Sequence, residues 1–279
     1  MLCCRFEKLT TVTNLLLLNL VLSCLLFIVS MPFAAAELLL SHWPFGDVIC
    51  KLVGSLYYLG FYSSVLFLTL LTFDRHLAVV YSLSAQRVRS RTYVLVSCAV
   101  VWILSALASI KPMILHKSFT NQLDDRAFCQ DDPQGSSQLL WSVGFYTQLL
   151  FFFLLPLLVI IYCYTRIVCT VLSSQIVSKF KTVRLIFVLV LLFFICWTPY
   201  NIALLMYESA NTPEEHRRWQ VTLNVTQKFT HLYFCISPIF YTFVGRKYQN
   251  YFRMLLVRHF PGLKRHISIS QISPTYMSS

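Results

Sequence analysis

The sequence predicts an all-α membrane protein that is a bundle of spanning helices. Hydrophobic residues make up 57% of the 279 residues and charged residues only 12%, and the mean hydropathy is +0.65, well outside the usual composition of soluble domains. Six apolar stretches are each long enough to cross a bilayer, because about 20 helical residues span its hydrocarbon core. These stretches are residues 14–36, 50–73, 93–114, 139–165, 183–207 and 221–244.

The positions of Lys and Arg predict how these spans are oriented. The segments on one side hold 16 of the 23 Lys and Arg but only two of the 11 acidic residues, and they are residues 1–13, 74–92, 166–184 and 245–279. Because cytoplasmic segments retain positive charge, this side is predicted to face the cytoplasm, with both ends of the chain inside. The net charge of +12 is therefore mainly a topology signal, and no nucleic acid is expected as a partner.

The first two spans carry the features that connect one side of the membrane to the other. Proline inside a membrane helix removes a hydrogen bond, so Pro32 is expected to bend the span 14–36. The second span begins at Cys50 and, after the next residue, carries no charge until Asp74 and Arg75. Hydrocarbon does not tolerate an unpaired acid or guanidinium, so these two residues are expected to pair at the inner face.

Cys50 has a candidate partner in the outer loop of about 25 residues between the third and fourth spans. Both Cys50 and Cys129 fall on the predicted outer side, where disulfides persist. A bridge between them would pin this loop over the mouth of the bundle. Most of the other cysteines are expected to be small membrane-buried residues.

Each of the last three spans contains a proline. Pro156, Pro199 and Pro238 lie at comparable depths, which favours a bundle with preset bends. Prolines are also common in membrane helices in general, which is the plainer interpretation of any one of them. Trp197 lies two residues before Pro199, and a large ring above a kink is a candidate two-position switch.

The chain after the last span divides into two parts. In residues 245–258, basic residues alternate with aromatic residues and leucines at helical spacing, which predicts an amphipathic helix on the inner leaflet. Residues 259–279 are predicted to be a disordered cytoplasmic tail. The transmembrane bundle is thus residues 1–244. The candidate phosphorylation sites of the tail are Ser268, Ser270, Ser273 and Ser278.

The order of these landmarks resembles the class A, or rhodopsin-like, G-protein-coupled receptors. A cysteine at a helix start is followed by Asp-Arg, a lone Trp102, a loop cysteine, a Cys-Trp-x-Pro span and a Pro-x-x-Tyr span. The stretches SHWPFGDVICK and VRLIFVLVLLFFICWTPYNIALL narrow the resemblance to chemokine receptors. The run DRHLAVVYSLSAQRVRSRTY is most like the XC-type receptor for lymphotactin, with CC-type receptors close behind. The resemblance covers nearly the whole chain.

The resemblance implies a seven-transmembrane-type helical bundle in the plasma membrane. Six spans are present, as equivalents of helices 2 to 7, together with a short amphipathic inner helix. The first helix and the N-terminal ligand-capturing arm of the family are expected to be missing, as in a fragment or an incomplete gene model. No cofactor and no metal are expected.

Several positions depart from the pattern of the family that the chain resembles. The family usually has an aspartate at Cys24 and an asparagine at Ser237, so its sodium pocket is predicted to be lost, because a thiol is a poor ligand for a hard cation. The acidic residue that many chemokine receptors carry in the last span falls at Gln227. His76 replaces the tyrosine of the Asp-Arg-Tyr motif.

On the outer face, the resemblance implies that a chemokine docks, usually a small basic protein. Asp124 and Asp125 are expected to attract it at long range. Two of the cavity residues, Tyr57 and Tyr207, are interpreted either as ligand contacts or as ordinary interhelical packing. The cavity that receives the N-terminus of the chemokine is expected to be lined by Glu37, Tyr57, Tyr207, Glu208 and Gln227.

On the inner face, the resemblance implies a latch that opens toward a G protein. Asp74 is expected to hold Arg75 at rest and to release it when the span 183–207 swings outward around Pro199. The activation switch is assigned to Trp197, Pro199, Pro238, Tyr241 and Tyr164, and G-protein coupling to Asp74, Arg75, Lys179 and Arg184. Lys179 and Arg184 are alternatively anchors to anionic lipid. The expected partners are a heterotrimeric G protein of the inhibitory type, arrestin and membrane lipids, with calcium mobilisation and chemotaxis as the response.

Other functional classes fit the sequence less well. A transporter would favour internal repeats and mid-membrane charges, and an intramembrane enzyme would need a paired acid, a Ser-His arrangement or a metal motif such as HExxH, so the chain is not expected to be an enzyme. The closer alternative is a non-signalling scavenger or truncated remnant receptor that does not couple to G protein. The largely intact Asp74–Arg75 motif argues against a scavenger.

Overall fold

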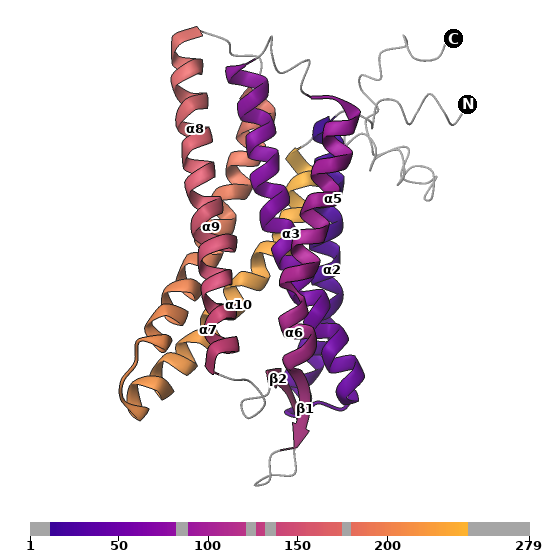
Figure 1. The fold of residues 1–279 in the computed structure, drawn as a ribbon, viewed down its shortest axis with the longest axis vertical. Helices are drawn as coiled ribbons and strands as arrows, with labels where there is room; N and C mark the ends of the chain where they lie inside the picture. Colours follow the sequence, from indigo (N-terminus) through magenta and orange to yellow (C-terminus); the bar gives the residue numbers. More distant parts are fainter. Residues whose placement is uncertain (1–11, 82–88, 121–126, 132–137, 175–179, 245–279) are drawn as a thin grey trace, which may run out of the picture.

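The computed structural model describes residues 12–81, 89–120, 127–131, 138–174 and 180–244, and these form a bundle of long helices with one short hairpin at its end (Figure 1). This confirms the prediction of an all-α membrane bundle. The helical segments in chain order are α2 (Val12–Leu40), α3 (Gly46–Val80), α5 (Arg91–Ala108) with α6 (Ile110–Leu115), α7 (Gln138–Leu149) with the π-helical turn η1 (Leu150–Leu154) and α8 (Leu155–Ser174), α9 (Phe180–Glu208) and α10 (Pro213–Val244).

The helices correspond to the predicted spans but extend beyond them at one or both ends. Within the described residues, five segments are long and apolar enough to cross a membrane: Val12–Leu40, Gly46–Val80, Arg91–Leu115, Ser142–Leu172 and Ile186–Glu208. The helix α10 has 32 residues and covers the sixth predicted span, but polar and charged residues such as Glu214 and Lys228 dilute its apolar character. The hydrophobic stretches locate the membrane-embedded part of each helix, whereas the helices continue into the aqueous layers on either side.

α3 packs closely against α2 because a glycine lies between them. A Cβ atom at Gly60 would lie 2.6 Å from the backbone nitrogen of Phe27, so only a residue without a side chain permits this approach. Small residues are the usual means of close helix packing in membranes, where lipid is as apolar as the side chains themselves. The outward face of α2 is correspondingly apolar and exposed, with Leu18 63% accessible, as expected for a surface that faces lipid.

Aromatic rings fill the centre of the bundle. Trp197 of α9 is only 1% exposed and stacks on Phe61 of α3, with ring centroids 3.9 Å apart and planes at 12°. Phe27 of α2 stacks on Phe234 of α10 with centroids 3.6 Å apart. These contacts join four helices through large surfaces, and interhelical stacking of this kind contributes beyond simple burial.

Two helical spans depart from a single regular helix. The predicted span 93–114 is interrupted at Ser109, where α5 ends and α6 begins. In the predicted span 139–165 the N–H of Leu155 donates to the carbonyl of Leu150, five residues earlier, and this π-helical step immediately precedes Pro156. Proline lacks the N–H that a regular helix would use at that position, so a local π-helical turn is a common accommodation.

The outer loop contains a hairpin that the sequence did not predict. Strand β1 (His116–Thr120) pairs antiparallel with β2 (Ala127–Asp131), and Ser118 lies opposite Cys129. Each strand has only five residues, and an isolated pair of this size is marginal in water. The hairpin therefore depends on its contacts with the helices.

A capping box fixes the start of α10. The hydroxyl of Thr212 accepts a hydrogen bond from the N–H of Glu215 at 3.2 Å, and the Glu215 carboxylate accepts from the N–H groups of Asn211 and Thr212 at 3.1 and 3.3 Å. These reciprocal bonds satisfy amides that have no partner within the helix. The hydrogen bonds from Asn211 and then Thr212 lower the pKa of Glu215 below its ordinary value of 4.5.

The start of α10 is expected to loosen in acid. Because the pKa of Glu215 is lower in the folded protein, its contribution to stability is complete above the ordinary value of 4.5 and is lost as the pH falls through the folded value. Hydrogen exchange of the amides at Asn211 and Thr212, compared between pH 7 and pH 3 after correction for intrinsic rates, should show severalfold lower protection in acid. Glu215→Ala should abolish this change and Glu214→Ala should leave it intact; equal protection at both pH values would contradict the capping role.

Candidate functional site

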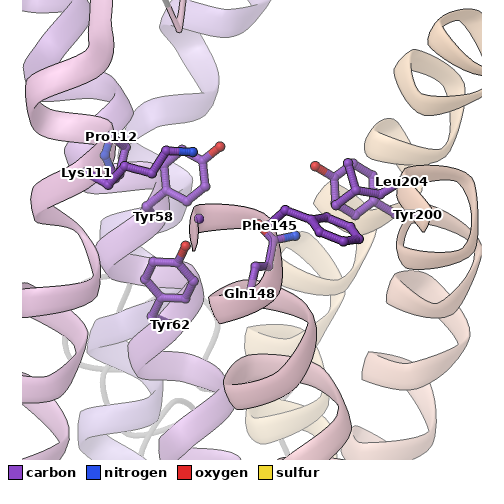
Figure 2. A pocket seen from close by; sticks show the side chains of 9 residues that line it. Tyr58, Tyr62, Lys111, Pro112, Phe145, Gln148, Tyr200 and Leu204 are labelled. Carbon is purple, nitrogen blue, oxygen red and sulfur yellow. The ribbon is translucent and has the colours of Figure 1, made fainter. Parts of the chain in front are cut away.

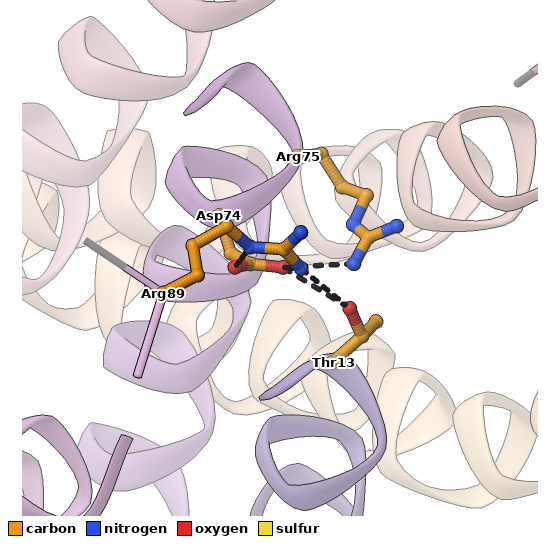
Figure 3. Close-up of polar contacts among 4 residues, drawn as sticks. All are labelled: Thr13, Asp74, Arg75 and Arg89. Carbon is orange, nitrogen blue, oxygen red and sulfur yellow. Dashed lines mark hydrogen bonds and ion pairs between the residues drawn. The ribbon is translucent and has the colours of Figure 1, made fainter. Parts of the chain in front are cut away.

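A cluster of charged residues closes the inner end of α3 (Figure 3). Asp74 is fully buried, and its Oδ2 atom accepts from Arg75 Nη2 at 2.8 Å. Arg89 donates to both carboxylate oxygens, from Nε to Oδ1 at 2.7 Å and from Nη2 to Oδ2 at 3.0 Å. The hydroxyl of Thr13 donates to Oδ2 at 3.1 Å and accepts from Arg89 Nη2 at 3.3 Å.

The cluster shows why an acid can be buried here. A buried carboxylate is tolerated only when opposite charges and hydrogen bonds replace its hydration, and Asp74 receives both from two guanidinium groups and a hydroxyl. Three elements meet at this point: Thr13 lies in the first turn of α2, Asp74 lies near the inner end of α3, and Arg89 lies two residues before the start of α5. Ser90 caps α5 by accepting from the N–H of Tyr93, which fixes where the helix begins and places Arg89 beside Asp74.

The sequence identified Asp74 and Arg75 but missed the other two members of this cluster. Arg89 is one of several arginines in the inner loop, and nothing in the local pattern distinguishes it from Arg87 or Arg91. Thr13 lies 61 residues from Asp74 in the sequence. A weak signal was present nonetheless, because Arg89 directly precedes a serine in a position to cap a helix.

The other residues assigned to the inner site lie in several places. Tyr164 of α8 bonds through its hydroxyl to Thr72, which is fully buried on α3. Arg184 is exposed near the start of α9. Pro238 and Tyr241 fall within the bounds of α10, but the described side chains do not include theirs. Lys179, the predicted helix 245–258 and the tail serines lie outside the described residues.

The predicted disulfide joins Cys50 at the outer end of α3 to Cys129 on β2, with the Cα atoms 5.6 Å apart, which confirms the pairing. Two acidic residues hold the same hairpin. Glu37 of α2 accepts from the N–H of Cys129 at 3.0 Å, and Asp47 of α3 accepts from the N–H of Ser118 at 3.1 Å. The hairpin is therefore attached to both α2 and α3 beside the disulfide.

The residues assigned to the ligand cavity do not all meet. Tyr57 of α3 lies edge-on to His231 of α10 with ring centroids 5.9 Å apart, on the stretch of α10 that also carries Gln227, so α3 and α10 contact one another at this point. Tyr207 instead packs edge-on against His216, with ring centroids 5.1 Å apart. Glu37 is occupied by the hairpin. Glu208 is the last residue of α9. Asp124 and Asp125 lie outside the described residues.

The structure has a cavity of about 60 Å³ between α3, α6, α7 and α9 (Figure 2). Its position near the hairpin follows from its lining, because α6 leads directly into β1. The sequence did not indicate this cavity, since its residues come from four helices. The lining residues are Tyr58, Tyr62, Lys111, Pro112, Gly144, Phe145, Gln148, Tyr200 and Leu204.

Two of the positions that depart from the family pattern, Cys24 and Ser237, lie together inside the bundle. Cys24 and Ser237 are both fully buried, and the thiol sulfur lies 3.4 Å from the serine hydroxyl. The predicted loss of sodium binding stays a prediction.

Comparison with known proteins matches the sequence of this chain to one family. Residues 1–241 match the family model described as 7 transmembrane receptor (rhodopsin family). The C-C chemokine receptor type 3 of Cavia porcellus is 35% identical over 260 residues, which cover 91% of this chain and 72% of the relative. The C-C chemokine receptor type 1 of Homo sapiens is 35% identical over 263 residues, covering 91% and 73%.

A third relative, the probable C-C chemokine receptor type 3 of Mus musculus, is 33% identical over 260 residues, which cover 91% of this chain and 72% of the relative. These relatives are of the C-C type, and the likeness to the XC-type receptor stays a prediction. The matches confirm a multi-pass plasma-membrane protein and a receptor rather than an enzyme. The chain therefore belongs to the rhodopsin family of seven-transmembrane receptors, among its chemokine receptors.

Proposed function

We propose that this receptor binds a chemokine at the end that carries the β1–β2 hairpin and signals through a heterotrimeric G protein of the inhibitory type at the other. The observation that carries the proposal is that α3 joins the two ends: Cys50 ties its outer end to the hairpin, and Asp74 and Arg75 form the charged cluster at its inner end. The chemokine receptors among its relatives support the ligand class.

The middle of α3 offers a route between these ends. Trp197 on α9 stacks on Phe61 of α3, and Pro199 lies inside α9 close to this stack. An outward swing of the inner half of α9 around Pro199 would slide or break the stack. A large packed ring has discrete alternative positions, so this contact suits a two-state change better than a gradual one.

At the inner end, the ion pair provides the resting state. Arg75 is bound to Asp74, yet its Nε atom has no hydrogen-bond partner within the described part of the chain. A partly satisfied guanidinium has more to gain from a new acceptor than a saturated one. Once α9 moves, Arg75 is expected to turn toward Tyr164 and the G protein, with arrestin later engaging the phosphorylated tail.

Calcium release in cells that express the 279-residue chain tests this function. A panel of C-C chemokines together with lymphotactin should contain at least one agonist, and pertussis toxin should abolish the response if the G protein is of the inhibitory type. Arg75→Ala should abolish signalling but preserve binding of the labelled chemokine, whereas Arg91→Ala, an exposed arginine on α5, should preserve both. Chemokine uptake without any G-protein response would overturn the signalling half of the proposal, and the absence of binding would overturn the ligand half.

Arg89→Gln is expected to loosen the resting state without unfolding the receptor. The change removes the bidentate contact with Asp74 but leaves the bonds from Arg75 and Thr13. Loss of a charge-assisted bond typically costs about 1–3 kcal/mol, so basal nucleotide exchange on the G protein should rise severalfold. Arg91→Gln provides the control for the same charge change nearby. Unchanged basal exchange with normal expression would show that Arg89 has only a structural role.

A further inference from the structure

The cavity between α3, α6, α7 and α9 is lined by a positively charged side chain, that of Lys111. A positive charge is unexpected here, because the ligands of the family are usually basic proteins. Lys111 of α6 extends along the cavity beside Tyr58, and Tyr62, Gln148 and Tyr200 line the same space (Figure 2). Among the described residues that line it, the polar groups are hydroxyls, an amide and this one ammonium, and none is acidic.

On α7, which forms the opposite side of the cavity, a glycine leaves space for the lysine side chain. Gly144 of α7 faces the end of the Lys111 side chain so closely that a Cβ atom at that position would clash first with Lys111 Nζ and would lie 2.6 Å from Cδ and 2.8 Å from Cε. A side chain at 144 would therefore move the lysine ammonium away from its present position. The glycine thus permits Lys111 to reach across from α6 to α7 and brings its ammonium into the cavity.

The geometry points to Lys111 as the anchor for a carboxylate on the ligand segment that enters the bundle. An ammonium has three donors, so it can keep a neighbouring protein acceptor and still bind an anion. The side chains of Tyr58, Tyr62 and Tyr200 give the same cavity a polar lining, and its volume of about 60 Å³ leaves room for a carboxylate group.

This subsite sets specificity by exclusion as well as attraction. The inferred ligand combines a basic body, which suits a chemokine, with an acidic or carboxylate-bearing tip. A basic tip would place two like charges in a confined site, which is strongly unfavourable. The inference rests on the proposed function for the identity of the ligand, but the anion site itself can be tested without any chemokine.

The first experiment uses benzoate and benzamide as a charged and a neutral probe of the same shape. The purified 279-residue receptor in detergent is titrated with sodium benzoate, with benzamide, and with sodium chloride at matched ionic strength, and its thermal unfolding midpoint is measured. Benzoate should raise the midpoint in a saturable manner and benzamide should raise it much less. Lys111→Gln should weaken the apparent benzoate affinity by about tenfold, as expected for loss of a charge-assisted bond.

Two further variants separate the anion site from general damage to the fold. Gly144→Ala keeps the charge but fills the space that the end of the Lys111 side chain occupies, so it should also weaken the benzoate response. Lys117→Gln removes the same charge from the exposed position on β1 and should leave the response unchanged. Equal effects of benzoate and benzamide on the unliganded wild type, or an unchanged benzoate response in Lys111→Gln, would overturn the inference.

A second experiment tests whether Lys111 determines which N-terminal residue of a chemokine the receptor prefers. A chemokine core that binds the receptor is extended with N-terminal tips that differ only in carrying Asp, Asn or Lys. Wild type should prefer the Asp tip, and Lys111→Glu should reverse the order. If chemokines bind and signal but show no such preference, the inferred subsite fails while the proposed function stands. Failure of every chemokine to bind, with a normal benzoate response, would count against the proposed function instead.

Discussion

Asp74→Asn is expected to destabilise the receptor by about 3–5 kcal/mol, because it leaves two guanidinium groups facing each other without a buried counter-charge. The side chains of Arg75 and Arg89 are only 16% and 24% exposed, so water cannot replace the lost carboxylate fully. For a chain of this size the loss corresponds to a fall of roughly 10 °C in the thermal unfolding midpoint. The measurement is a thermal denaturation of the purified protein in detergent.

The expected loss comes from repulsion and desolvation and not from a change of shape, since asparagine is nearly isosteric with aspartate. Asp47→Asn is the matched control, because Asp47 is largely exposed and pairs only with Lys51 among the described ion pairs. That substitution should change the midpoint by no more than a degree or two. A second variant, Asp74→Asn with Arg89→Gln, should recover part of the loss by removing one of the two stranded charges. If the double variant is no more stable than the single one, the electrostatic explanation is wrong.

The helices were predictable because the bilayer imposes a local rule. A spanning segment must satisfy its own backbone hydrogen bonds, so composition over about 20 residues is enough to identify it. The interruption at Ser109 and the hairpin formed by His116–Thr120 and Ala127–Asp131 were not predictable in the same way. The hairpin is held by tertiary contacts, and its strands carry little pattern of their own.

The functional residues that could be predicted are likewise those whose role depends on local sequence or on membrane topology. Cys50 and Cys129 could be paired because topology places both outside, and Asp74 and Arg75 because they adjoin one another at the end of an apolar helix. Arg89 was missed because its role depends on a contact across 15 residues of chain. A charge's sequence position shows which side of the membrane it occupies, but not which partner it finds.

Lys111 illustrates a further limit of the sequence. The residue lies near the outer end of a predicted span, where a lysine is readily explained by extension of its amino group to the aqueous layer. Its proximity to Gly144 and to the tyrosines of α3 appears only when four helices are assembled. The sequence did not single out Gly144 either. Its role is to leave space for Lys111, and that role cannot be recognised before the two helices are placed beside each other.

Removal of the Cys50–Cys129 bridge is the second change with a large expected effect. The bridge spans 79 residues of sequence, and closing a loop of that length contributes up to about 4 kcal/mol by restricting the unfolded chain. In a membrane the effect should be smaller, because inserted helices already restrict the chain. The double variant Cys50→Ser, Cys129→Ser is therefore expected to lower the unfolding midpoint by several degrees and to weaken chemokine binding at least tenfold.

The larger consequence should be local. Without the bridge, the hairpin keeps the bonds from Cys129 N–H to Glu37, from Ser118 N–H to Asp47 and from Trp43 N–H to the carbonyl of Ala127, each of which contributes only about 1–2 kcal/mol to a pair of five-residue strands. Hydrogen exchange of the β1 and β2 amides should accelerate strongly while the buried amides of α3 stay protected. Cys169→Ser, which removes an exposed free thiol, should change neither. If the hairpin amides stay protected after loss of the bridge, the remaining contacts are enough to position the hairpin, and the disulfide acts only by restricting the unfolded chain.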